Sequence, residues 1–186
     1  MLSQFSPEGE RLTLASLFDF PKDIYPVGRL DAESEGLLLL TNDKEINHRL
    51  LNPKFKHRRT YLTQLDGDIT PEAVQLLSKG VTISVDSKPH KTMPAAVKKF
   101  TGEPDLPERN KPIRFRKNIP TSWIEITLYE GKNHQVRKMT AAVGFPTLRL
   151  VRISIEGITL GNMQPGEIIC LEKSQVYNLL FKNNLL

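Results

Sequence analysis

The stretch "GRLDAESEGLLLLTND", residues 28–43, places Asp31, Glu33 and Glu35 at alternate positions directly before four consecutive leucines. The leucines predict a buried strand that ends in a turn. On residue types alone, the three acids fit an exposed loop. Asp31, however, stands between Arg29 and the apolar run, which favours a carboxylate at the edge of the core. Such a carboxylate needs a cation or hydrogen bonds to stay ionised, and it could then act as a nucleophile or base.

The composition around this stretch is that of a soluble globular protein, because 39% of the 186 residues are hydrophobic and 25% are charged. That length allows one domain or two small ones. The first residues carry no basic region and no long apolar run, so we expect no signal peptide. The single cysteine, Cys170, cannot form an internal disulfide, which fits a reducing compartment and predicts a cytoplasmic protein.

Basic residues are unevenly distributed along the chain, which has a net charge of +5. Residues 46–65 and 131–155 contain no Asp or Glu, and residues 108–118 form a third basic segment. Lys and Arg side chains that meet phosphates release condensed counterions, so three such segments favour a polyanionic partner such as nucleic acid. Three ordinary solvated faces are the alternative.

Helical and strand patterns follow one another without regular alternation, which indicates an α+β fold. Asp43 suits the N-cap of one helix, and Thr70 that of another, which Gly80 would end. Residues 101–120 have no steady period and are expected to form a surface loop. Helices are expected at 12–21, 43–53, 70–80, 132–144 and 174–186, and strands at 35–41, 59–67, 81–99 with a turn at 86–87, 122–131, 147–160 and 166–172.

Several common site types find no support in the sequence. The acids of residues 31–35 imitate a calcium loop, but its twelfth position is Asn42 instead of a bidentate Glu. No nucleophile-elbow pattern is present. Zinc is disfavoured because there is no cysteine pair and no paired spacing among the histidines, which are His48, His57, His90 and His134.

The opening stretch closely resembles the catalytic motif of the RsuA-type pseudouridine synthases of ribosomal RNA. The resemblance continues in order through "RRTYLTQLDG", "IPTSWIEITLYEGKNHQVRKMTAAVGFPTLRLVRISI" and "LGNMQPGE", and spans about residues 2–172. "NKPIRFRKNIPTSW" and "VGFPTLRLVR" look most like the RluE branch, which acts on large-subunit ribosomal RNA. The resemblance implies the α+β pseudouridine synthase fold, with a mixed, mostly antiparallel sheet flanked by helices and loops.

The resemblance also implies roles for matching residues. Asp31 is the expected catalytic aspartate, acting on the ribose carbon or on a neighbouring ribose proton. Tyr61 would stack on the target base, which suits a base turned out of its helix. Arg137 would pair with Asp31 and keep it ionised. Arg29 would enter the RNA where the base has left, and Leu150 would line the base pocket.

Plain structural roles remain open for Tyr61 as a strand residue, for Leu150 as core and for Arg137 as a surface cation with Lys138 as a rival. Glu33 and Glu35 have no assigned role beyond setting the turn. The basic segments would hold RNA phosphates, with Lys56, Arg58 and Arg59 in one segment and Arg114 and Arg116 in the other.

Residues 1–186 are expected to form one catalytic domain, undivided or built from two subdomains with the active site between them. We expect no S4-type domain, because Asp31 lies too near the start to leave room for one, and the RluE branch also lacks it. A strand found before "LSQF" in family members is expected to be lost, through either a truncated start or a misplaced coding start. That loss would leave a sheet edge unpaired. We expect a monomer acting on nascent or partly assembled ribosomal RNA, with no cofactor, metal or membrane.

Two other functional classes compete with the synthase. An RNA-binding or assembly factor could keep the fold without catalysis, although Asp31, Tyr61 and Arg137 are all intact. A glycoside hydrolase could use paired carboxylates. It would leave the basic segments unexplained, and one Trp offers few aromatic platforms for sugars.

Overall fold

A six-stranded sheet forms the centre of the computed structural model, which describes residues 2–109 and 120–181. Five strands follow the order β10-β9-β4-β8-β7 with antiparallel pairing, and β2 joins the sheet by pairing with β9 in parallel. Two small sheets pair β1 with β3 and β5 with β6. The strands are β1 (Tyr25–Pro26), β2 (Glu35–Gly36), β3 (Leu40–Thr41), β4 (Arg59–Asp66), β5 (Thr82–Val85), β6 (Lys88–Lys91), β7 (Ala96–Phe100), β8 (Thr121–Leu128), β9 (Thr147–Ile155) and β10 (Ile158–Thr159).

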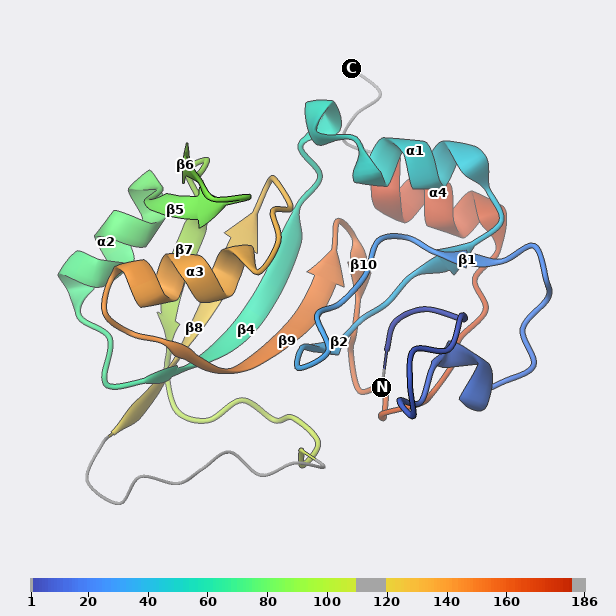
Figure 1. Cartoon of the computed structure of the whole chain (residues 1–186), viewed down its shortest axis with the longest axis horizontal. Helices are drawn as coiled ribbons and strands as arrows, with labels where there is room; N and C mark the ends of the chain where they lie inside the picture. Colours follow the sequence, from blue (N-terminus) through green and yellow to red (C-terminus); the bar gives the residue numbers. More distant parts are fainter. Residues whose placement is uncertain (1, 110–119, 182–186) are drawn as a thin grey trace.

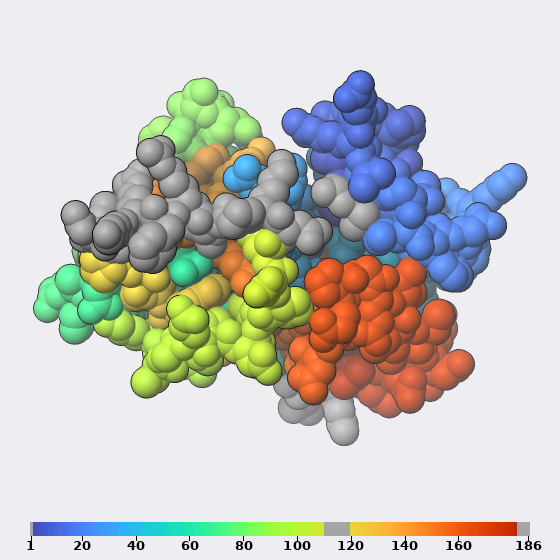
Figure 2. Space-filling model, turned by 90° about the horizontal axis from the view of Figure 1, so that it is seen from below, coloured from blue at the N-terminus to red at the C-terminus, as the bar shows by residue number. Residues whose placement is uncertain are grey.

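Helices flank this sheet in two groups (Figure 1). Helices α2 and α3 cover the sheet at one end of the molecule, whereas α1 and α4 lie side by side at the other end. Figure 2 shows the N-terminal residues in blue and residues 160–172 in orange-red at that second end. The helices are α1 (Lys44–Leu51), α2 (Pro71–Lys79), α3 (Gln135–Ala142) and α4 (Lys173–Phe181), with the 3-10 helices η1 (Leu14–Ser16) and η2 (Pro53–Phe55). The α+β prediction is confirmed.

Two hydrophobic clusters hold these elements together. Alternation along β8 directs Ile124, Ile126 and Leu128 into the first cluster, where they meet side chains of α2 and α3. The second cluster joins α1 and α4, and includes Leu37 from the opening stretch. No helix in the described part of the chain combines the length and hydropathy that a membrane crossing requires.

The predicted helix ends at α1 and α2 are confirmed. The Asp43 carboxylate accepts hydrogen bonds from the backbone N–H groups of Glu45 and Ile46, which have no partner within the first turn of α1. The Thr70 hydroxyl does the same for Ala73 in α2. The capping residues therefore predicted correctly where both helices begin.

The leucine run is not the single strand that its pattern predicts. The two ends of the predicted strand 35–41 belong to β2 and β3, which lie in different sheets. The chain turns at Gly36, where φ is +99°, and Leu37 enters the second cluster. The predicted turn after the run becomes the N-cap of α1.

Two other sequence predictions are wrong. Residues 12–21 form only the short η1, and Leu12, Leu17 and Phe18 are exposed. A short helix in water depends on burying an apolar face, and of the leucines in this segment only Leu14 is buried. Residues 166–172 form no strand, since Ile168 and Ile169 are exposed and no neighbouring strand pairs with them. The loop prediction for 101–120 holds for the described residues 101–109.

Candidate active site

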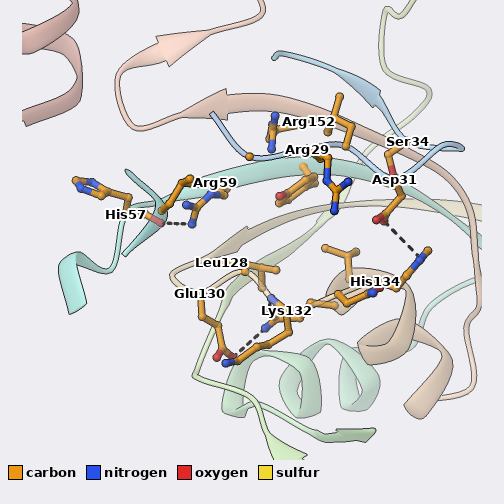
Figure 3. A pocket seen from close by; sticks show the side chains of 18 of the residues that line it. Arg29, Asp31, Ser34, His57, Arg59, Leu128, Glu130, Lys132, His134 and Arg152 are labelled. Atoms are coloured by element: carbon orange, nitrogen blue, oxygen red, sulfur yellow. Dashed lines mark hydrogen bonds and ion pairs between the residues drawn. The ribbon is translucent and has the colours of Figure 1, made fainter. Parts of the chain in front are cut away.

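A pocket opens where the stretch around Asp31 meets the face of the central sheet (Figure 3). Its walls come from residues 27–31, from the loop 129–134 and from strands β4 and β9. Side chains of both hydrophobic clusters reach it, among them Leu50 and Leu150. Of the site residues that the sequence predicted, the lining includes Arg29, Asp31, Arg59, Tyr61 and Leu150.

The backbone around Asp31 is anchored on both sides. On one side, Leu30 N–H donates to the Ser3 hydroxyl at 2.9 Å, and that hydroxyl donates back to the Leu30 carbonyl at 3.0 Å. On the other side, Gly36 pairs with Arg152 of β9, and Leu37 N–H donates to the Arg152 carbonyl at 2.8 Å. A Cβ on Gly36 would lie 2.3 Å from the carbonyl oxygen of Arg152, so only glycine allows this approach.

Asp31 faces the N-terminal end of α3. Its Oδ2 atom lies 3.5 Å from Nδ1 of His134, and 32% of its side-chain surface is exposed. His134 immediately precedes α3 and has a left-handed backbone, with φ at +53°. The Asp31 carboxylate is therefore partly desolvated, open to the pocket and close to a group that can carry positive charge.

The predicted pairing of Arg137 with Asp31 is not what the structure shows. Among the described residues, the basic partner of Asp31 within 4.0 Å is His134. Arg137 lies within α3, and its guanidinium donates to the Glu33 carbonyl at 3.1 Å and to the Thr147 carbonyl at 3.5 Å. Arg137 thus ties α3 and β9 to the loop that carries Asp31.

Strand register brings the aromatic and apolar residues of the pocket together. Tyr61 on β4 lies opposite Ile126 of β8 and Arg152 of β9. Leu150 is two residues from Arg152 and therefore projects from the same face of β9. The pocket places Tyr61 and Leu150 in the common lining with Asp31, as the sequence predicted.

The predicted basic residues divide into two groups. Arg29 and Arg59 line the pocket, whereas Lys56 and Arg58 are exposed and lie outside its lining. The Arg58 Nε atom donates to the Glu156 carboxylate at 3.0 Å. Arg114 and Arg116 lie outside the described residues.

Glu35, which had no assigned role, joins a cluster of charges. Its carboxylate accepts from Arg149 Nε and Nη2 at 3.1 and 2.8 Å, and Arg109 Nε lies 3.2 Å away. This bidentate pair of side chains also holds β2 against β9. Glu35 and Arg149 are 114 positions apart in the chain, so no local spacing could have revealed the contact.

A buried acid, Glu130, holds the loop opposite Asp31. Its Oε1 atom accepts from Met93 N–H at 2.8 Å and from Gln135 Nε2 at 2.9 Å, while Oε2 lies 3.1 Å from His90 Nε2. These contacts fix residues 129–134 against the β5–β7 region. They therefore set the position from which His134 approaches Asp31.

The end of the pocket away from Asp31 contains His57, whose side chain is buried. Its Nδ1 atom lies 3.0 Å from the Glu156 carboxylate, while Nε2 is buried and has no partner among the described residues. Burial lowers the pKa of His57, against the opposing effect of Glu156. His57 and Arg152 are pocket residues to which the sequence assigned no function.

No group of three or more His, Cys, Asp or Glu side chains gathers at ligand distance within residues 2–109 and 120–181. The lining of the pocket combines the Asp31 carboxylate, the Tyr61 ring and several cationic side chains.

Comparison with known proteins shows which family the chain resembles. The family described as RNA pseudouridylate synthase matches residues 6–142. "Ribosomal large subunit pseudouridine synthase E" of Vibrio parahaemolyticus is 49% identical over 166 residues, which cover 89% of this chain and 67% of that protein. The protein of the same name from Xanthomonas campestris is 44% identical over 169 residues, covering 90% and 88%.

A solved structure supports the same relationship at the level of the fold. The structure described as "Crystal structure of pseudouridylate synthase" superposes with a TM-score of 0.72 at 27% identity. The match covers 90% of this chain and 65% of that one, so the chain spans about two thirds of its length. The predicted fold is confirmed, and the chain belongs to the RNA pseudouridylate synthase family.

Proposed function

We propose that this protein converts one uridine of large-subunit ribosomal RNA to pseudouridine, with Asp31 as the catalytic carboxylate. The relatives from Vibrio and Xanthomonas carry that activity in their names and match about nine tenths of this chain. The observation that carries the proposal is the position of Asp31, which shares one pocket with Tyr61 and Arg29. Family membership also argues against the glycoside hydrolase considered from the sequence.

The walls of the pocket suit a uracil base. Tyr61 presents an aromatic ring, and Leu128 and Leu150 add apolar surface. A base inside an RNA helix cannot reach Asp31, so the uridine must first leave its stack, at a cost of a few kcal/mol. Stacking on Tyr61 would offset part of that cost. Arg29 is exposed next to Asp31 and would occupy the space that the base vacates.

The reaction needs no atoms beyond those of the uridine and water. The bond between N1 and the ribose C1′ breaks, the uracil turns, and a bond forms between C5 and C1′. The proton on C5 is lost to water, and N1 gains one. Asp31 would act on the ribose, as a nucleophile at C1′ or as a base on a neighbouring ribose proton.

We also propose that the substrate is RNA that is not yet packed into a mature ribosome. The exposed Lys56 would meet phosphates of an RNA strand that approaches the pocket. Extrusion costs least where the duplex is already loosened, so nascent or partly assembled RNA is the proposed substrate. The proposal includes a cytoplasmic monomer, and equal activity on intact subunits would contradict the substrate choice.

Tritium release from C5-labelled ribosomal RNA transcripts tests the proposal directly. The wild-type protein should release tritium, and Asp31→Asn should release none, because the amide can be neither nucleophile nor base. Glu33→Gln is the matched control, since Glu33 is a neighbouring exposed acid whose carboxylate lies outside the pocket lining. This control should retain most of the activity.

The possible failures have distinct meanings. Release by Asp31→Asn at the wild-type rate would remove Asp31 from the mechanism. Tight RNA binding without release by any variant, on free RNA and on ribosomal particles, would favour the assembly factor without catalysis.

A further inference from the structure

Two arginines lie in the pocket on the side of Arg29 away from Asp31 (Figure 3). Arg59 is two residues before Tyr61 on β4, so both side chains project from the same face of that strand. Arg152 is the cross-strand partner of Tyr61 on β9. In Figure 3, Arg59 and Arg152 are drawn to the left of Arg29, whereas Asp31 and His134 lie to its right.

The hydrogen bonds of these arginines go to uncharged groups. Arg59 donates to the carbonyls of Leu50 and His57. Arg152 donates through Nε to the Leu37 carbonyl at 2.8 Å, and its Nη2 atom is buried without any partner among the described residues. Only 4% of the Arg152 surface is exposed. Arg152 lines the pocket, and its Nη2 group keeps donor capacity that no acceptor in the described residues uses.

No acid balances these two charges within the described part of the chain. Neither guanidinium has a carboxylate within 4.0 Å there. Glu156, whose charge acts on Arg59, is already bonded to His57 and Arg58. Burial lowers the pKa of Arg59, and repulsion from Arg152 adds to that effect. A buried cation, Arg152, beside a half-buried one, Arg59, is costly unless an anion joins them.

We propose that Arg59 and Arg152 form an anion subsite that binds a phosphodiester group of the RNA next to the uridine held against Tyr61. The planar fork of a guanidinium matches the oxygens of a phosphate, and hydrogen bonds between such groups are strong. The ligand would thereby supply the negative charge and the acceptor that the protein lacks. The proposal rests on the proposed function for its RNA, and free inorganic phosphate offers the same chemistry.

A structural role for Arg152 makes a different prediction. If Arg152 only secured the Leu37 carbonyl, its replacement would lower stability equally in every buffer. An anion subsite instead makes stability depend on the anion, because a ligand that binds the folded state alone stabilises it. A comparison of stability in two anions therefore distinguishes the structural role of Arg152 from anion binding.

The first arm uses inorganic phosphate as the probe. Melting temperatures of wild type, Arg152→Gln and Arg59→Gln are compared in phosphate and in chloride at equal ionic strength. Arg149→Gln is the matched control on the same strand, because the Arg149 guanidinium is already paired with Glu35. Phosphate stabilises folded proteins in general, so the specific subsite should appear as a larger stabilisation of the wild type and the control than of the other two variants. Equal responses in all four proteins would overturn the proposal.

The second arm measures RNA binding against salt concentration. Loss of one phosphate contact should reduce the slope of log affinity against log salt by about 0.7 to 0.9 in Arg152→Gln, and the control should keep the wild-type slope. If the phosphate response vanishes in a variant while its RNA slope stays at the wild-type value, the anion is not an RNA phosphodiester, which overturns the assignment. Arg59→Gln provides the same test if Arg152→Gln does not fold.

Neither arm requires isomerisation. Absence of tritium release would therefore contradict the proposed function. The anion subsite is tested separately, by the melting temperatures and the salt dependence of RNA binding.

Discussion

The imidazole of His134 is the basic group that contacts Asp31, with 3.5 Å between Nδ1 and Oδ2. The contact joins the loop of residues 28–35 to the start of α3 across the mouth of the pocket. Half of the His134 side chain is exposed, at 51%, so water screens the interaction. An exposed contact of this kind contributes little free energy, which sets an upper limit on what it can contribute to catalysis.

Replacement of His134 by Ala should reduce kcat/KM for tritium release by about 1.4- to 5-fold, the equivalent of 0.2–1 kcal/mol for an exposed pair. The Asp31 carboxylate would stay open to the pocket. Lys138→Ala on the same helix is the control, since Lys138 does not line the pocket. A loss above about a hundred-fold would assign His134 a direct part in the chemistry.

Arg137 should act through the position of the Asp31 loop. Arg137→Ala removes two hydrogen bonds from a charged donor to the Glu33 and Thr147 carbonyls, so we expect stability to fall by about 1.5 kcal/mol. Activity should fall together with it, as measured by urea denaturation and tritium release. Arg137→Lys should restore part of both. Lost activity at unchanged stability would instead favour a direct pairing of Arg137 with Asp31 during the reaction.

Most of the local structure could be predicted from the sequence. Asp43 and Thr70 marked helix starts because capping needs only a short side chain near free N–H groups. Alternation in β8 identified its buried face. The strand prediction for the leucine run was wrong because four apolar residues can form a strand or can pack singly into a core. The close contact of Gly36 with β9 excludes a continuous strand.

The candidate site was only partly predictable for a similar reason. Tyr61 and Leu150 were found through motifs, and strand register then placed them in one pocket. His134 and Arg152 were missed because their importance arises from partners about a hundred residues away in the chain. Arg152, for example, bonds Leu37.

Gly36→Ala should disrupt the site without touching any reacting group. The new Cβ would meet the Arg152 carbonyl at 2.3 Å, and φ of +99° is unfavourable for alanine, so we expect a loss of roughly 2–4 kcal/mol. The loop would separate from β9, and tritium release should drop with stability. Gly102→Ala is the matched control, because φ is +77° there but nothing lies within 4 Å. It should cost about 1 kcal/mol. Equal losses in both variants would contradict the steric argument.

The stability of the α1–α4 pair should depend on the charge of Asp43. Its carboxylate caps α1, lies 2.8 Å from Lys173 Nζ and accepts from the Tyr177 hydroxyl at 3.1 Å. The hydrogen bond from Lys173 is the main reason that the pKa of Asp43 falls to about 2. An unfolded Asp has a pKa of about 3.9, so the stabilisation is complete above that value. It is lost progressively as the pH falls toward 2.

Asp43→Asn tests this dependence because asparagine keeps the cap but not the charge. At pH 7 the variant should unfold more easily than the wild type, and the difference should shrink as the pH falls from 4 toward 2. Asp43→Ala should lose about 1 kcal/mol more, since it also removes the cap. Free energies of unfolding from urea titrations at several pH values provide the measurement. A difference between wild type and Asp43→Asn that stays constant over this range would show that the Asp43 charge does not join α1 to α4.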